Sequence, residues 1–156
     1  MTTELRSVPM HPDLDNDAVN DVLNQILEIE LSGVVRYTHF SLIIVGPNRI
    51  PLVAFMKGQA GESLIHAQQV GEILTGLGGH PSLRIAPIED NHRRGIHDIL
   101  GDSLGHELRA LELYRQLLAL VENKSVFLEE FARVQISAEE QHQLELRKMM
   151  RDFAEG

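Results

Sequence analysis

The sequence predicts an all-α protein, a bundle of four long helices. Hydrophobic residues make up 43% of its 156 residues but aromatic residues only 4%, with no Trp, a composition that suits packed helices better than a β-sandwich. Apolar residues recur at three- and four-residue steps over four stretches of about 27 to 32 residues. Helices of this length would span about 40 to 48 Å, as in a four-helix bundle.

The first two helices are expected to form an antiparallel pair. Asp15 or Asn16 can cap a first helix that runs to about Val45. Its apolar stripe consists of Val19, Val22, Leu23, Ile26, Val34 and Tyr37. Gly, Pro and Asn at 46–48 then interrupt the pattern, and a second helix is expected from about Ile50 to Leu77. The link between the two is too short for any arrangement but antiparallel neighbours.

The second pair follows a longer connection. Two glycines at 78–79 end the second helix, and residues 80–90 show no clear period. A third helix is predicted over about Asn91 to Glu122, and Ser125 can cap a fourth that continues to about Phe153. Because the middle connection can carry the chain along the bundle, we expect a single-crossover topology.

Length and composition limit the classes of function. The length fits one domain, residues 1–156, with residues 1–15 as an N-terminal lead-in. Cysteine is absent, so any metal site must use His and carboxylates. The net charge of −9 favours cations over nucleic acid as partners. No segment reads as a membrane span or a signal peptide, so we expect a cytoplasmic protein without a membrane partner.

Polar residues interrupt the apolar stripes of all four predicted helices. Glu30 and Glu107 each lie seven residues before a tyrosine, Tyr37 and Tyr114, on the buried face. The fourth helix carries an inward Glu and His at i and i+3, and the second carries a Glu and a His near the same height. This set consists of Glu62, His66, Glu139 and His142.

A pair of divalent cations would explain these polar residues together. Any one of them alone fits a plainer alternative, a carboxylate at the rim of the core or a hydrogen-bonded core histidine. Several buried carboxylates without metal would repel one another and lose hydration. Two cations carry four positive charges, which four carboxylates match, and two neutral imidazoles complete the ligand shells.

The segments 23–31, 62–67, 77–81, 104–108 and 139–142 carry a resemblance to a known family. Their order and spacing resemble the bacterioferritin branch of the ferritin-like di-iron carboxylate superfamily, from about residue 16 to 153. The resemblance implies oxidation of Fe(II) by O2 or peroxide at a di-iron site, for iron storage and detoxification. It implies Glu30 and Glu107 as terminal or bridging ligands, and Glu139 with His142 as the ligand pair of the fourth helix.

The second helix departs from the family pattern. The pattern needs Glu three residues before His66, and Ser63 occupies that position. Glu62 remains a candidate ligand, but it is rotated by about 100° around the helix and needs a changed rotamer or a local helix adjustment. The site is therefore expected to be dinuclear, mononuclear or empty according to what Glu62 does.

Two other departures concern haem and assembly. The family holds haem with a methionine where this chain has Leu64, and Met56 reads as an ordinary apolar contact, so we expect no haem. The chain stops at Gly156 without the short fifth helix of cage-forming relatives. We expect at least a homodimer, with a larger cage as a further possibility, through a second apolar line on the first two helices. That line consists of Val35, Leu42, Met56, Ala60, Ala67, Val70 and Leu74.

Some roles remain open. Tyr37 is a candidate accessory residue that hydrogen-bonds a ligand or donates an electron, with plain packing as the alternative. Other histidines, including His106, are expected at the surface or at caps. Besides a ferroxidase, Ser63 and Leu64 suggest a metal-poor structural subunit that co-assembles with an active partner. A di-iron oxygenase acting on an organic substrate would need a pocket and partner proteins that the sequence does not indicate.

Overall fold

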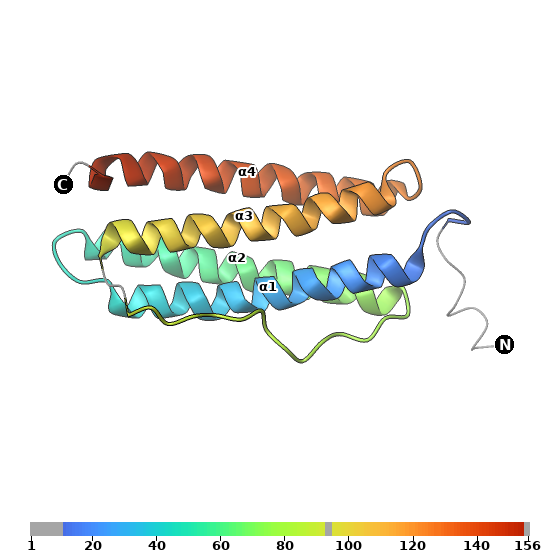
Figure 1. The fold of residues 1–156 in the computed structure, drawn as a ribbon, viewed down its shortest axis with the longest axis horizontal. Coiled ribbons are helices and arrows are strands. Elements are labelled where there is room, and N and C mark those ends of the chain that lie inside the picture. The colour runs from blue at the N-terminus through green and yellow to red at the C-terminus, as the bar shows by residue number, and fades with distance from the viewer. Residues whose placement is uncertain (1–10, 93–94, 155–156) are drawn as a thin grey trace.

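Four α-helices lie side by side in a computed structural model, which describes residues 11–92 and 95–154. They are α1 (Asn16–Ile43), α2 (Arg49–Gly76), α3 (Ile96–Val121) and α4 (Val126–Ala154) (Figure 1). Those residues contain no β-strand. The predicted all-α four-helix bundle is confirmed. Within the same ranges, no helix is long and apolar enough to cross a lipid bilayer.

Local capping explains where the helices begin. The Asp15 carboxylate accepts a hydrogen bond from the Ala18 amide at 3.1 Å, which caps α1 as predicted. Ser125 Oγ does the same for α4, accepting from the Leu128 amide at 3.2 Å. The predicted start of the third helix near residue 91 is wrong, because α3 begins at Ile96. His92 has a φ of 56°, a left-handed backbone conformation that a right-handed helix excludes.

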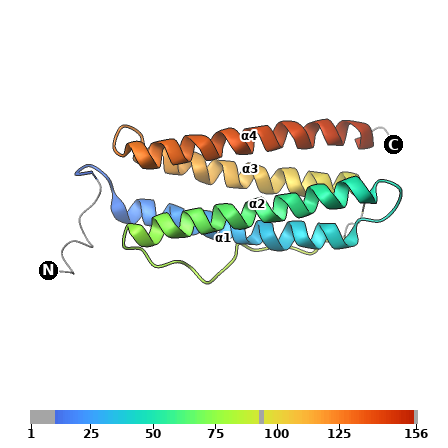
Figure 2. The ribbon, with the colours of Figure 1, turned by 180° about the vertical axis from the view of Figure 1, so that it is seen from behind.

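The connection that follows α2 in the sequence carries the chain back along the bundle before α3 begins, as the single-crossover prediction requires. Residues 77–92, the crossover, run beside α1 along the length of the bundle (Figure 1), and Figure 2 shows the same path from behind. Asn24 on α1 holds this crossover by donating to the His80 carbonyl at 3.0 Å and accepting from the Ser82 amide at 2.8 Å. Further along, the Ala86 amide donates to the Glu28 carbonyl at 2.9 Å.

The helices do not pack equally closely. α1 packs against α2 and α3, and α3 packs against α4, whereas no Cα atoms of α2 and α4 approach within 8 Å of each other. The apolar core forms two clusters, one around Leu23, Leu74 and Leu117 and the other around Phe40, Met56 and Leu146. Between them lies a layer of polar side chains. The helix pairing therefore leaves this layer covered least on the side of α2 and α4.

The second apolar line predicted for the dimer surface is mostly wrong. Met56, Ala67, Val70 and Leu74 are buried in the bundle core. Only Val35 and Leu42 among the large members of that line are exposed. These α2 residues face inward because that helix supplies one side of both core clusters, a role that periodicity alone does not distinguish from an interface.

Candidate metal centre

Every helix contributes to the polar layer at the middle of the bundle. Glu30 comes from α1, His66 from α2, Glu107 from α3, and Glu139 with His142 from α4. The three carboxylates are buried, and the two imidazoles are mostly buried. Glu139 and His142 are three residues apart, so one face of α4 carries both. Five of the six residues predicted to bind metal thus lie together.

Their ligand atoms form two groups that share one carboxylate. Glu30, His66 and Glu139 make the first group, and Glu107, Glu139 and His142 the second. Within each group the atoms lie within 4.8 Å of one another. Both histidines face the carboxylates with Nδ1. The Nδ1 of His66 is 3.6 Å from Glu30 Oε2, and that of His142 is 3.7 Å from Glu139 Oε2. Each group could hold a metal ion, and Glu139 belongs to both.

The donor set fits metal ions better than it fits hydrogen bonding among its own members. Separations of 3.6 to 3.8 Å between imidazole nitrogens and carboxylate oxygens are too long for hydrogen bonds. His142 Nδ1 and Glu139 Oε2 are buried without a hydrogen-bond partner. Ligand atoms placed about 2 Å from a common ion are separated by roughly 3 to 4 Å. An ion would therefore satisfy atoms that the protein leaves unsatisfied.

Two tyrosines hold the carboxylates from the opposite helix. The Tyr37 hydroxyl on α1 donates to Glu107 on α3, and the Tyr114 hydroxyl on α3 donates to Glu30 on α1 at 3.0 Å. Sequence spacing placed Tyr37 near Glu30 of its own helix, but its partner is the carboxylate across the bundle. Both tyrosines are fully buried. The crossed pair fixes the orientation of Glu30 and Glu107 in the absence of metal.

The pKa values of the carboxylates in the second ligand group are shifted in opposite directions. Burial raises the pKa of Glu139, and the adjoining carboxylate of Glu107 raises it further. Burial would also raise the pKa of Glu107, but its interactions with Glu139, His142 and Tyr37 outweigh that effect and lower the pKa. The two carboxylates raise the pKa of His142 to about 10. Without metal, protons at Glu139 and His142 therefore offset the negative charge.

The first ligand group behaves similarly. Burial raises the pKa of Glu30, and interactions with His66 and Tyr114 offset only part of that effect. Burial lowers the pKa of His66, but the neighbouring Glu30 carboxylate more than compensates, so the net shift is upward. Cations bound between these side chains would take the place of the extra protons.

The sixth predicted ligand, Glu62, lies outside both groups. Its Oε2 is 3.0 Å from His142 Nε2, the nitrogen that points away from the other carboxylates. The Glu62 side chain is 46% exposed, whereas the side chains of Glu30, Glu107 and Glu139 are at most 5% exposed. Ser63, which has no carboxylate, is the buried neighbour. Glu62 thus contacts the centre at its solvent edge.

Sequence reasoning missed His106. It was expected at the surface or at a cap, but it is buried beside the centre. Its ring packs edge-on against the Tyr37 ring, with 5.6 Å between the two ring centroids. Gly33 makes the space, because a Cβ there would lie 2.8 Å from His106 Nε2 and 2.7 Å from Ser63 Oγ. Ser103 and Ala110, small buried residues one turn before and after His106, were the available signal for this close packing.

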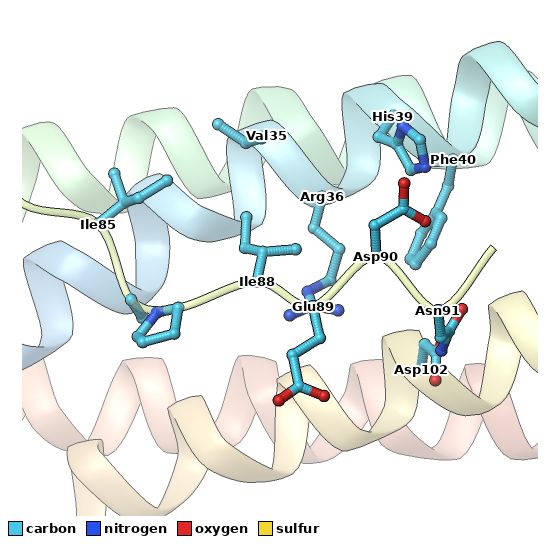
Figure 3. Close-up of a pocket in the computed structure, with 12 residues that line it drawn as sticks. Val35, Arg36, His39, Phe40, Ile85, Ile88, Glu89, Asp90, Asn91 and Asp102 are labelled. Carbon is cyan, nitrogen blue, oxygen red and sulfur yellow. The ribbon is translucent and has the colours of Figure 1, made fainter. Parts of the chain in front are cut away.

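A separate pocket of about 390 Å³ lies on the outer surface, between α1, the crossover and the start of α3 (Figure 3). Val35, Phe40 and Ile85 contribute apolar walls, and Arg36 and Asp102 contribute charge. None of the residues predicted to bind metal lines this pocket. The polar layer and the outer pocket are therefore distinct features.

Comparisons with known proteins agree with this fold. Residues 20–155 match the model of the ferritin-like domain. A dodecameric thioferritin, the bacterioferritin-related protein from Bacteroides fragilis, has a TM-score of 0.82 at 21% identity, covering 92% of this chain and 90% of that one. A ferritin-like, diiron-carboxylate protein from Bacillus anthracis has a TM-score of 0.78 at 21% identity, and the match covers 87% of this chain and 97% of that one.

A third similar structure is the Rhodobacter capsulatus bacterioferritin, described with a metal-free dinuclear site and haem iron. It has a TM-score of 0.73 at 23% identity, covering 88% of this chain and 86% of that one. No curated protein matches the chain. At these identities the likeness establishes the fold.

Proposed function

Because this chain belongs to the ferritin-like domain family, which its residues 20–155 match, we propose that it binds Fe(II) in the bundle interior and oxidises it to Fe(III). The observation that carries the proposal is the pair of inward ligand groups, Glu30–His66–Glu139 and Glu107–Glu139–His142. Their hard oxygen donors favour the ferric product, and imidazole also suits iron. Iron is the substrate of this reaction and, as Fe(III), the stored cargo.

The electron balance requires two Fe(II) for each oxidant molecule. Each Fe(II) gives one electron, and the pair reduces O2 with two protons to H2O2, or reduces H2O2 with two protons to two waters. The protons held at Glu139 and His142 in the metal-free protein must leave when cations bind. Tyr37 orients Glu107 through its hydroxyl and is the candidate accessory residue.

The test is an anaerobic Fe(II) titration of metal-free protein, followed by exposure to O2. We expect saturation near two Fe(II) per chain and fast oxidation. Glu139→Gln should abolish both, because it removes the carboxylate that the two groups share. Glu140→Gln is the matched control, since Glu140 is the next residue on α4 and is exposed. Binding that Glu139→Gln leaves intact would contradict the proposal.

One observation favours a second candidate function. Ser63 is buried at the position where a Glu-x-x-His pair would supply another carboxylate, and only Glu139 is shared by the two groups. A metal-poor structural subunit that co-assembles with an active partner would show this loss. Purified protein that binds no Fe(II) and oxidises none would favour the structural subunit.

We also propose that the chain self-associates. Large apolar side chains are exposed around the turn between α1 and α2, with Leu42 at 69%, Val45 at 71% and Ile50 at 85%. The similar Bacteroides fragilis protein is described as dodecameric. Light scattering after size exclusion should give a mass of at least two chains, and a monomer at micromolar concentration would contradict self-association.

A further inference from the structure

We propose that Fe(II) enters the centre through the gap between α2 and α4, and that Glu62 is the first ligand it meets there. This inference rests on the proposed function, because it concerns access to the same centre. It gives Glu62 a role other than that of a ligand in the finished centre, for which its place beside Ser63 made it a candidate. Three features carry it: the helix spacing, the gradient of exposure across the centre, and the contact of Glu62 with His142.

The helices pack more closely on the other three sides of the centre than between α2 and α4. α1 packs closely against α2 and α3, and α3 against α4, while α2 and α4 have no Cα pair within 8 Å. The crossover adds a further layer beside α1 (Figure 1). The least closely packed side of the centre is therefore the one between α2 and α4.

The exposure of the site residues rises toward the same gap. Glu30 and Glu107, from α1 and α3, have side chains only 3% and 5% exposed. The imidazoles of His66 and His142, from α2 and α4, are 12% and 18% exposed. Glu62 on α2 is the most exposed of the set. A cation approaching from solvent on this side meets Glu62 first.

Glu62 is exposed to solvent and also contacts a residue of the second ligand group. Its Oε2 is 3.0 Å from His142 Nε2, and the Nδ1 of the same ring faces Glu107 and Glu139 at 3.8 and 3.7 Å. Gln59 adds a neutral amide, which donates to Glu62 Oε2 at 3.4 Å. One imidazole thus separates the exposed carboxylate from the buried ones. A cation held by Glu62 is one side chain away from the second ligand group.

The α2–α4 side becomes more apolar away from Glu62. Toward the C-terminal end of α2 it becomes an apolar groove of about 460 Å³, with walls formed by Ile65, Ile73, Phe127 and Phe131. These four side chains offer no ligand to a hydrated cation, although Gln68 and Gln69 add two amides to the lining. Glu72 lines that groove too, ten residues from Glu62 on the same helix. It provides a carboxylate of equal charge that does not touch the centre.

The experiment measures Co(II) binding to metal-free full-length protein by stopped-flow absorption, without oxidant. Glu62→Gln should slow association by about threefold to tenfold and leave the Co(II) stoichiometry unchanged. Glu72→Gln, the matched control, should change the rate little. Raising the salt to about 0.5 M screens general attraction, so the difference between the two variants should persist there. Glu62→Asp, which keeps a carboxylate, should recover part of the rate.

The other outcomes are distinct. Equal association rates for Glu62→Gln and wild type would overturn the entry role. Loss of one Co(II) equivalent in Glu62→Gln would overturn it too, because Glu62 would then be a ligand of the finished centre. Wild-type protein that binds no Co(II) or Fe(II) at all would instead refute the proposed function. Since Glu62 is exposed, its substitution should leave folding intact, which circular dichroism checks.

Discussion

At the scale of single residues, the absence of a side chain at position 33 shapes the centre. Gly33 lies on α1 one turn beyond Glu30, and Ser63 and His106 approach it from α2 and α3. Their contacts bring three helices together at one point beside the ligands. The lack of a Cβ is what permits this approach, because the φ of Gly33 is an ordinary helical one that any residue could adopt.

Gly33→Ala should therefore destabilise the protein by about 1 to 3 kcal/mol, despite the better helix propensity of alanine. The added methyl group would lie 2.7 Å from Ser63 Oγ and 2.8 Å from His106 Nε2. Urea unfolding measures the loss. Gly71→Ala on α2 is the matched control, because nothing lies within 4 Å of its added Cβ. Equal stability of the two variants would refute the tight contact.

His106 should make the metal-free protein sensitive to acid. Burial lowers its pKa from 6.5 to about 4, and Arg36 and Arg109 add to that effect while Glu107 opposes it. Between these two pH values the unfolded chain binds a proton that the folded chain does not. The contribution of neutral His106 to the free energy of unfolding is therefore complete above about pH 6.5. It falls by on the order of 3 kcal/mol as the pH decreases to 4.

His106→Gln removes this titration. Urea unfolding at several pH values should show a shallower loss of stability in the variant than in the wild type across that window. Parallel pH profiles for the two proteins would mean that His106 does not cause the acid sensitivity.

The site residues were predictable where periodicity decides burial. Glu30, Glu107, Glu139 and His142 interrupt apolar stripes, and all four lie in the polar layer. The partner of Tyr37 and the burial of His106 depend on which helices face each other and how closely. Those distances arise from small residues on neighbouring helices, such as Gly33, and a single helix pattern does not contain them.

At the scale of elements, local sequence predicted the helices and the existence of the crossover, but not the path that the crossover takes. Caps at Asp15 and Ser125 and glycine near the end of α2 mark boundaries that local chemistry decides. The crossover has neither period nor cap, so its path depends on hydrogen bonds to α1. Asn24 makes two of them, to residues that follow it by more than 50 positions.

Asn24→Ala should loosen the start of the crossover. Loss of these two hydrogen bonds should lower the free energy of local opening by about 1 to 2 kcal/mol. The open population should then rise roughly five- to thirtyfold. Arg84 lies in this stretch and is exposed, so limited trypsin digestion with mass spectrometry can follow cleavage after it. Gln25→Ala, an exposed change next to Asn24, should leave cleavage as in the wild type. Unchanged cleavage in Asn24→Ala would show that other contacts hold the crossover.

At the scale of the whole molecule, the polar layer divides the core. Apolar clusters lie on both sides of it, around Leu23 in one half and Met56 in the other. The buried carboxylates between them lose hydration without a full set of partners. Stability of the whole bundle should therefore depend on whether cations occupy this layer.

Metal binding should stabilise the fold in proportion to its affinity. Free Co(II) at about 100 times its dissociation constant should add about 2.7 kcal/mol to the free energy of unfolding for one site. Thermal unfolding with and without Co(II) measures the effect, and a chelator should reverse it. Glu139→Gln should show little gain. An equal gain in both proteins would place the stabilising ion elsewhere.

The crossed tyrosine contacts make the centre depend on both helical hairpins. The α1–α2 hairpin carries two of the five residues in the ligand groups and the α3–α4 hairpin three, but the phenols that orient Glu107 and Glu30 each belong to the other hairpin. Neither half is a finished centre by itself, and each is complementary to the other. A chain cut within residues 77–95 would yield two fragments that must recombine to restore the centre.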